Sequence, residues 1–182
     1  ARKRQFDALM AGWQESREAH DKLERAMAET DRRMKETDRQ IGALGNRFGE
    51  LAEHLVAPSI REKFNALGYD FDEISLDKAI KYPDGQFVEV DILLENEHFS
   101  IAVEVKAKPR EKDIDEHIKR LEFLRRHKDR RHDSRKLQGA IAGAIMPAGV
   151  RSYALKTGFY VIEQTGDTVK IDKPEGFIPR EW

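Results

Sequence analysis

Residues 86–107 read QFVEVDILLENEHFSIAVEVKA, and this stretch decides the fold. Valine, isoleucine and leucine alternate with other residues on both sides of Glu95–His98, which is typical of two β-strands joined by a short loop. We therefore expect strands at 86–94 and 99–107 that form a hairpin. In its simplest register, Asp91 lies opposite Glu104 and Glu89 lies opposite Lys106.

This register brings two carboxylates and a lysine together on one face of otherwise apolar strands. Like charges that lie opposite each other destabilise a sheet, and buried carboxylates are costly unless they are paired. A divalent cation would remove the conflict, and Mg²⁺ typically takes one or two carboxylates, with water and phosphate oxygens completing its shell. The neighbouring lysine would position a water or stabilise charge that develops on phosphorus. The alternative is an exposed polar face with cross-strand ion pairs.

Asp91, followed thirteen residues later by Glu104-Val105-Lys106, resembles the PD-(D/E)XK nuclease superfamily. The expected order of helix, three antiparallel strands, helix and strand is similar to that family's core, and the helix around Gly49-Glu50-Leu51 resembles its first core helix. The resemblance covers roughly residues 46–165. More narrowly, the chain is similar to a group of prokaryotic proteins that join a coiled coil to this core.

The resemblance implies a role for each matching residue. Asp91 and Glu104 would be metal ligands with the carbonyl of Val105 as a third, and Lys106 would orient the attacking water. Glu50 would be the catalytic helix carboxylate, with Glu53 one turn later as its rival. The cofactor would be Mg²⁺ or Mn²⁺, and the substrate would be a nucleic acid, with DNA favoured. Val90 stands where the family's name-giving proline would be, a departure that is common in the family. Because some members of the fold have lost catalysis, the alternative is a non-catalytic coiled-coil scaffold, or a DNA- or partner-binding protein with a nuclease-like core.

The rest of the second half predicts an α/β domain in which helices flank a mixed sheet. The resemblance implies that this domain is restriction-endonuclease-like. A helix is expected at 47–67, with a break or kink at Pro58, and a strand at 69–80. Beyond the hairpin, apolar periodicity predicts a helix at 111–128, a strand at 137–146, a short helix at 147–156 and strands at 159–164 and 169–172.

Residues 1–45 carry apolar residues at alternating spacings of three and four without a proline, which is the pattern of a coiled coil. A lone helix of this kind is not stable in water, so we expect a homo-oligomer, most simply a dimer. Gly42, Gly45 and Gly49 predict a helix break, and the domain boundary is placed at 45/46. The a positions would be Phe6, Trp13, His20, Met27, Met34, Ile41 and Phe48. The d positions would be Leu9, Ser16, Leu23, Thr30, Thr37 and Leu44.

Charge is distributed unevenly although the whole chain has a net charge of −1. Residues 46–107 carry a net −7, and residues 108–136 carry a net +5. A basic cluster beside an acidic metal site could hold the phosphates of a nucleic acid. A solvated helix end is the equally open alternative. The candidate phosphate contacts are Arg125, Arg126, Lys128, Arg130 and Arg131.

Composition excludes several classes of protein. Without cysteine there is no disulfide scaffold, no redox pair and no thiolate zinc site. No apolar stretch approaches the length of a membrane span, and no apolar segment follows the basic start as in a signal peptide. Because the chain begins at Ala1 rather than Met, we expect a processed chain or a piece of a longer one. The expected location is the cytoplasm.

Overall fold

The structure is a computed structural model that describes the backbone of residues 2–182 and the side chains of residues 2–43, 49 and 52–182. The chain divides into two compact units, Ala1–Arg47 and Phe48–Trp182. Each unit is described by itself below. The boundary predicted at 45/46 stays a prediction.

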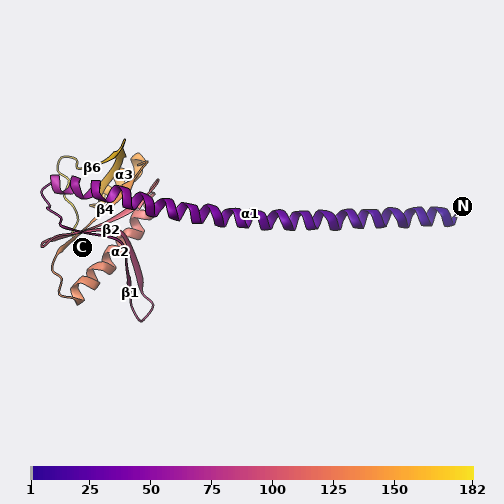
Figure 1. Ribbon diagram of the computed structural model, residues 1–182, viewed down its shortest axis with the longest axis horizontal. Helices are drawn as coiled ribbons and strands as arrows, with labels where there is room; N and C mark the ends of the chain where they lie inside the picture. The colour runs from indigo at the N-terminus through magenta and orange to yellow at the C-terminus, as the bar shows by residue number, and fades with distance from the viewer. Residues whose placement is uncertain (1) are drawn as a thin grey trace. The chain divides into compact units, whose positions relative to one another are not determined.

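A six-stranded mixed sheet forms the centre of the second unit (Figure 1). Its strands lie in chain order: β1 (Glu73–Lys81), β2 (Phe87–Glu95), β3 (Phe99–Lys106), β4 (Lys136–Gly143), β5 (Tyr160–Thr165) and β6 (Thr168–Asp172). The β3–β4 and β4–β5 pairs are parallel, and the other pairs are antiparallel. The predicted mixed α/β architecture is therefore confirmed.

Helices cover both faces of this sheet, as alternation in the strands requires. On one face, α2 (Glu111–Arg130) and α3 (Ala148–Lys156) enclose a core that includes Leu93, Ala102 and Leu121. On the other face, the C-terminal part of α1 (Arg2–Ala66) supplies Ala57, Ile60 and Phe64 to a second core with Ile92 and Val103. The two cores explain why nearly every apolar residue of β2 to β5 is buried.

Helix α1 runs without interruption from Arg2 to Ala66, so the break predicted at the glycine cluster is wrong. The helix is not broken at Pro58 either, and a kink there stays a prediction. Each glycine costs about 1 kcal/mol relative to alanine in a helix, which is too little to interrupt one that is favourable on both sides. Pro58 removes one backbone hydrogen bond, but fully buried Ala57 and Ile60 beside it hold this part of the helix against the sheet.

The first strand begins at Glu73 rather than at residue 69 as predicted. Gly68 and Asp70 both have left-handed backbone conformations, with φ of 95° and 55°. Asn65 then holds the connection in place, because its side chain accepts a hydrogen bond from Phe71 N and donates one to Phe71 O. A local turn therefore replaces the first residues of the expected strand.

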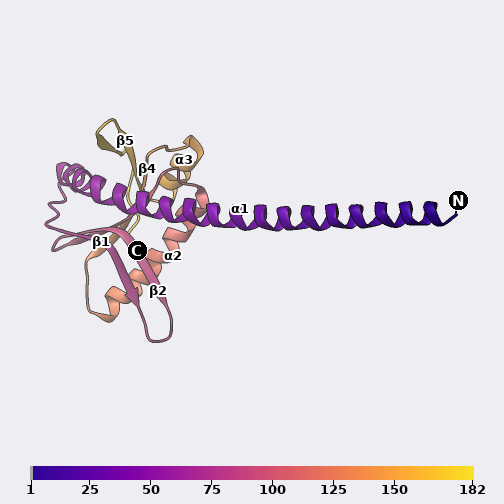
Figure 2. The ribbon, with the colours of Figure 1, turned by 45° about the vertical axis from the view of Figure 1, so that its right-hand side comes forward.

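The β1–β2 hairpin lies along α2 (Figure 2). Tyr82, directly after β1, packs its ring against Phe123 and His127 of α2. In the part of the chain that the structure describes, no helix combines the length and the hydropathy needed to span a bilayer.

Candidate active site at a fork between two strands

The candidate site lies where β2 and β3 part from each other. Their paired residues run from Glu95↔Ser100 to Ile92↔Val103, which is the predicted register. Past this point Val90 pairs with Lys78 of β1, whereas Glu104 to Lys106 pair with β4. Asp91 and Glu104 therefore lie one step beyond the last paired residues, at the mouth of a fork.

Asp91 fills the fork with its side chain. Its Oδ2 accepts a hydrogen bond of 2.8 Å from the backbone N–H of Val105, which the diverging strands leave without a β2 partner. Burial raises the pKa of Asp91 to about 6, and the negative charge of Glu104 acts in the same direction. The carboxyl group is thus held in a place where a negative charge is costly.

Glu104 is almost fully buried and uses both of its oxygens. Oε1 lies 3.0 Å from the Lys106 ammonium, and Oε2 lies 2.5 Å from Nη1 of Arg120. Burial acts to lower the pKa of Lys106, but the adjacent Glu104 carboxylate raises it above its ordinary value overall. The structure therefore brings the predicted Asp91, Glu104 and Lys106 together.

Sequence reasoning missed two residues of α2 that support Glu104. Fully buried His117 has its Nε2 2.9 Å from the carbonyl oxygen of Ala102, and its Nδ1 lies 3.1 Å from Nη1 of Arg120. Burial lowers the pKa of His117 to about 4, so the ring is neutral, donates from Nε2 and accepts from Arg120. The signal in the sequence was His117 itself, a polar residue that lies inside the apolar stripe of 114–124 and three positions before Arg120.

Glu53 is the helix carboxylate whose position the structure describes; the side chain of Glu50 lies outside the described residues. Glu53 is buried, and its Oε2 has no hydrogen-bond partner. Burial raises its pKa to about 8, and the Asp77 carboxyl, followed by the charge of Asp91, adds to the effect.

Asp77 is a further acidic residue that the sequence did not single out. The β1–β2 register places it opposite Asp91, between the Leu76↔Ile92 and Lys78↔Val90 pairs. Its φ of 49° is left-handed, a conformation that aspartate tolerates better than most residues but that is uncommon inside a strand. Acidic side chains from α1, β1, β2 and β3 therefore influence one another around the fork.

The donor set suits a hard divalent cation that takes few protein ligands. Within the described residues, no three His, Asp or Glu side chains are arranged to hold a metal ion together. Two carboxylates can raise each other's pKa over a distance too long for both to bind the same ion. The absence of such a cluster is therefore compatible with the mutual influence of Glu53, Asp91 and Glu104. Two carboxylates with phosphate and water oxygens are typical of Mg²⁺. Glu104 would have to exchange one of its present ion pairs to join such a site.

The basic block of 125–131 divides into paired and exposed residues. Lys128 is buried and lies 2.6 Å from Glu95 and 2.8 Å from Asp133. Arg125 donates to the backbone carbonyls of Asp133 and Arg135. These two side chains are thus engaged within the protein, whereas Arg126, Arg130 and Arg131 are exposed. The phosphate contacts predicted for the block stay a prediction.

Comparison with known proteins gives limited similarity. Residues 9–76 match the family described as a protein of unknown function (DUF3782), which is well under half of the chain. No curated protein matches. Among solved structures, the small subunit (R.BspD6I2) of the heterodimeric restriction endonuclease R.BspD6I aligns with 59% of this chain at 21% identity and a TM-score of 0.31. The aligned part is 63% of that subunit's length.

Proposed function

We propose that this protein is a metal-dependent nuclease that hydrolyses phosphodiester bonds, with DNA as the favoured substrate. One observation carries the proposal: a buried glutamate, an aspartate with a raised pKa and a lysine converge where two strands part. Such groups are typical of sites that hold a cation and a phosphate together. The proposal also rests on the resemblance of Asp91 and Glu104-Val105-Lys106 to the PD-(D/E)XK motif.

Each residue then has a distinct task. Asp91 and Glu104, with the carbonyl of Val105, would hold Mg²⁺ or Mn²⁺. The cation would supply Lewis-acid activation of the phosphate and of the attacking water. Lys106, 3.0 Å from Glu104, would donate a hydrogen bond to that water or to the phosphate oxygen. Glu53, with an unpartnered oxygen and a pKa near 8, keeps its proton at neutral pH and is the group suited to donate it to the leaving oxygen.

A cleavage assay on plasmid DNA with Mg²⁺ or Mn²⁺ tests the proposal. We expect Asp91→Asn, Glu104→Gln and Lys106→Met each to lower the rate by about 100-fold or more, as loss of a group acting in the transition state does. Glu89→Gln is the matched control, because Glu89 is an exposed carboxylate on the same strand. Equal cleavage by all four variants would place the activity elsewhere or in a contaminant.

A second candidate is a non-catalytic module with the same core. The close pairing of Arg120 with Glu104 favours it, because a guanidinium at 2.5 Å occupies the carboxylate that the cation would need. Calorimetric titration with Mn²⁺ distinguishes the two: no binding to the wild type, together with no cleavage, would favour the module.

A further inference from the structure

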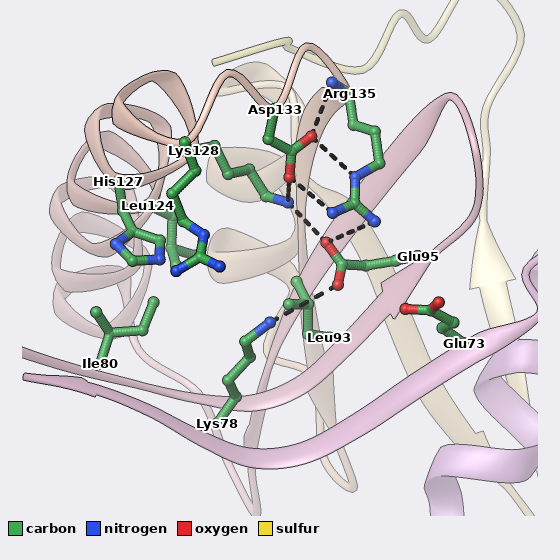
Figure 3. Close-up of a pocket in the computed structure, with 11 residues that line it drawn as sticks. Glu73, Lys78, Ile80, Leu93, Glu95, Leu124, His127, Lys128, Asp133 and Arg135 are labelled. Carbon is green, nitrogen blue, oxygen red and sulfur yellow. Dashed lines mark hydrogen bonds and ion pairs between the residues drawn. The ribbon is translucent and has the colours of Figure 1, made fainter.

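A polar cavity separate from the fork lies in the sheet unit, between β1, β2 and the C-terminal end of α2 (Figure 3). Its volume is about 350 Å³, within the range of sites that bind small molecules. Ile80, Leu93 and Leu124 supply apolar parts of its wall. We call it the α2 cavity.

Ion pairs fix one side of the α2 cavity. Buried Glu95 lies 2.6 Å from Lys128 and 3.3 Å from Arg135, and Asp133 lies 2.8 Å from Lys128 and 2.7 Å from Arg135. Burial opposes ionisation of Glu95, but Lys128 and the hydroxyl of Ser100 lower its pKa below the ordinary value. Because Glu95 and Asp133 are compensated, they repel a bound anion only weakly. Glu73, the third acidic residue of the lining, is exposed to solvent, which screens its charge.

Three other groups facing the cavity can still donate hydrogen bonds to a ligand. Lys78 approaches Glu95 only to 3.8 Å, and Arg131 forms no ion pair with any described residue. Figure 3 shows the ring of His127 on the same side as Leu124, facing the space above Lys78. Its Nδ1 lies 2.5 Å from the hydroxyl of Tyr82, so a Tyr82 O–H that donates to Nδ1 leaves Nε2–H as a donor.

The charges around His127 also favour a bound anion. Burial lowers its pKa, and the positive charges of Arg131, Lys78, Lys128 and Arg130 lower it further. The local potential is therefore positive although acidic residues line part of the wall.

We propose that the α2 cavity binds a small phosphorylated ligand of mononucleotide size. Its phosphate would accept hydrogen bonds from Lys78, Arg131 and Nε2 of His127, and its uncharged part would lie against Ile80, Leu93 and Leu124. Charge-assisted hydrogen bonds from a guanidinium and an ammonium are the usual means of holding a phosphate. This site does not depend on the carboxylates at the fork and goes beyond the proposed nuclease function.

Nuclear magnetic resonance of the full chain, labelled at histidine, tests the proposal with AMP as the probe and adenosine as the uncharged counterpart. We expect AMP to shift the His127 signal saturably and to raise the pKa of this ring, and adenosine to do neither. Lys78→Gln and Arg131→Gln should each weaken AMP binding about tenfold, as loss of a charge-assisted hydrogen bond does. Lys119→Gln is the matched control, since it removes one positive charge from an exposed position of α2.

Three results would overturn the site. The first is the absence of any saturable shift of His127 with AMP. The second is equal weakening by Lys119→Gln and Arg131→Gln, which would indicate general surface charge. The third is a shift of His127 with duplex DNA but not with AMP, which would make the cavity part of a nucleic-acid surface. Presence or absence of DNA cleavage does not affect these readings.

Discussion

Glu53 makes the stability of the protein depend on pH. In the unfolded chain its carboxyl group ionises near pH 4.5, whereas in the folded protein it keeps its proton up to a pKa of about 8. Between these values the folded state binds more protons, so stability falls as pH rises. Asp91, with a pKa raised to about 6, contributes a decline of the same sign at lower pH.

We therefore expect Glu53→Gln to have a stability similar to that of the wild type at pH 4.5 and to be more stable by about 2 kcal/mol at pH 9. Urea unfolding from pH 4.5 to 9, with EDTA present, measures this difference. The decline between pH 6 and 8 should disappear in the variant, while the part caused by Asp91 stays. A variant with the same slope as the wild type throughout would show that Glu53 ionises normally.

Arg120 occupies the carboxylate that a cation at the fork would need. Its guanidinium is hydrogen-bonded to His117, and His117 is hydrogen-bonded to the Ala102 carbonyl. Moving the guanidinium away from Glu104 therefore costs free energy. We expect Arg120→Met to tighten Mn²⁺ binding about tenfold or more, because it removes a positive charge next to Glu104.

Titration calorimetry with Mn²⁺ measures this effect, and Lys119→Met is the control, since it removes a charge from the exposed side of α2. The same Arg120→Met variant should lose stability in metal-free buffer, because Glu104 stays buried with only Lys106 beside it. Unchanged Mn²⁺ affinity would mean that Arg120 only supports the fold.

At the scale of single elements, β4 depends on small side chains. A Cβ added at Gly139 would lie 2.5 Å from the ring of Phe159 and 2.6 Å from Leu121, and both of these residues are fully buried. Gly149, in α3, has nothing within 4 Å of the same position. The tight site reflects close packing of α2 and Phe159 against the strand.

Gly139→Ala should therefore destabilise the protein by about 1–3 kcal/mol, which is the usual cost of overpacking. Gly149→Ala should be neutral or stabilise by up to about 1 kcal/mol, because it only reduces the freedom of the unfolded chain. Thermal and urea unfolding of the two variants give the comparison. If Gly139→Ala and Gly149→Ala change the free energy of unfolding by similar amounts, α2 moves readily away from β4 to make room for the added methyl group.

Elements that depend on local pattern were predictable from the sequence. The hairpin register followed from alternation in 86–107, and it placed Asp91 and Glu104 side by side. The fork itself was not predictable, because the alternation continues through both strands and does not indicate where the pairing of β2 with β3 ends. Glu53 was named only as the rival of Glu50, and His117 and Arg120 were missed, since the rotation of each helix over the sheet depends on packing between segments far apart in sequence.

The N-terminal unit carries a row of exposed apolar side chains along one side of its helix. Phe6, Trp13, Met27, Met34 and Ile41 are each at least 60% exposed in the single chain, all at predicted a positions. The polar d positions do not prevent burial, because the hydroxyls of Thr30 and Thr37 already donate to the carbonyls of Ala26 and Arg33. Exposed apolar side chains in such a row are typical of an interaction surface.

We expect the full chain to be a dimer in solution and Met27→Asp together with Met34→Asp to convert it to a monomer. A buried carboxylate at two consecutive a layers is costly without a partner charge, so association should weaken by more than about 100-fold. Analytical ultracentrifugation measures the mass, and helical circular dichroism should fall because an isolated helix of this composition is marginal in water. Arg25→Asp with Arg32→Asp is the matched control, because both positions lie on the side of the helix opposite the seam. A monomeric wild type, or a control as dissociated as the seam variant, would show that this helix has another partner.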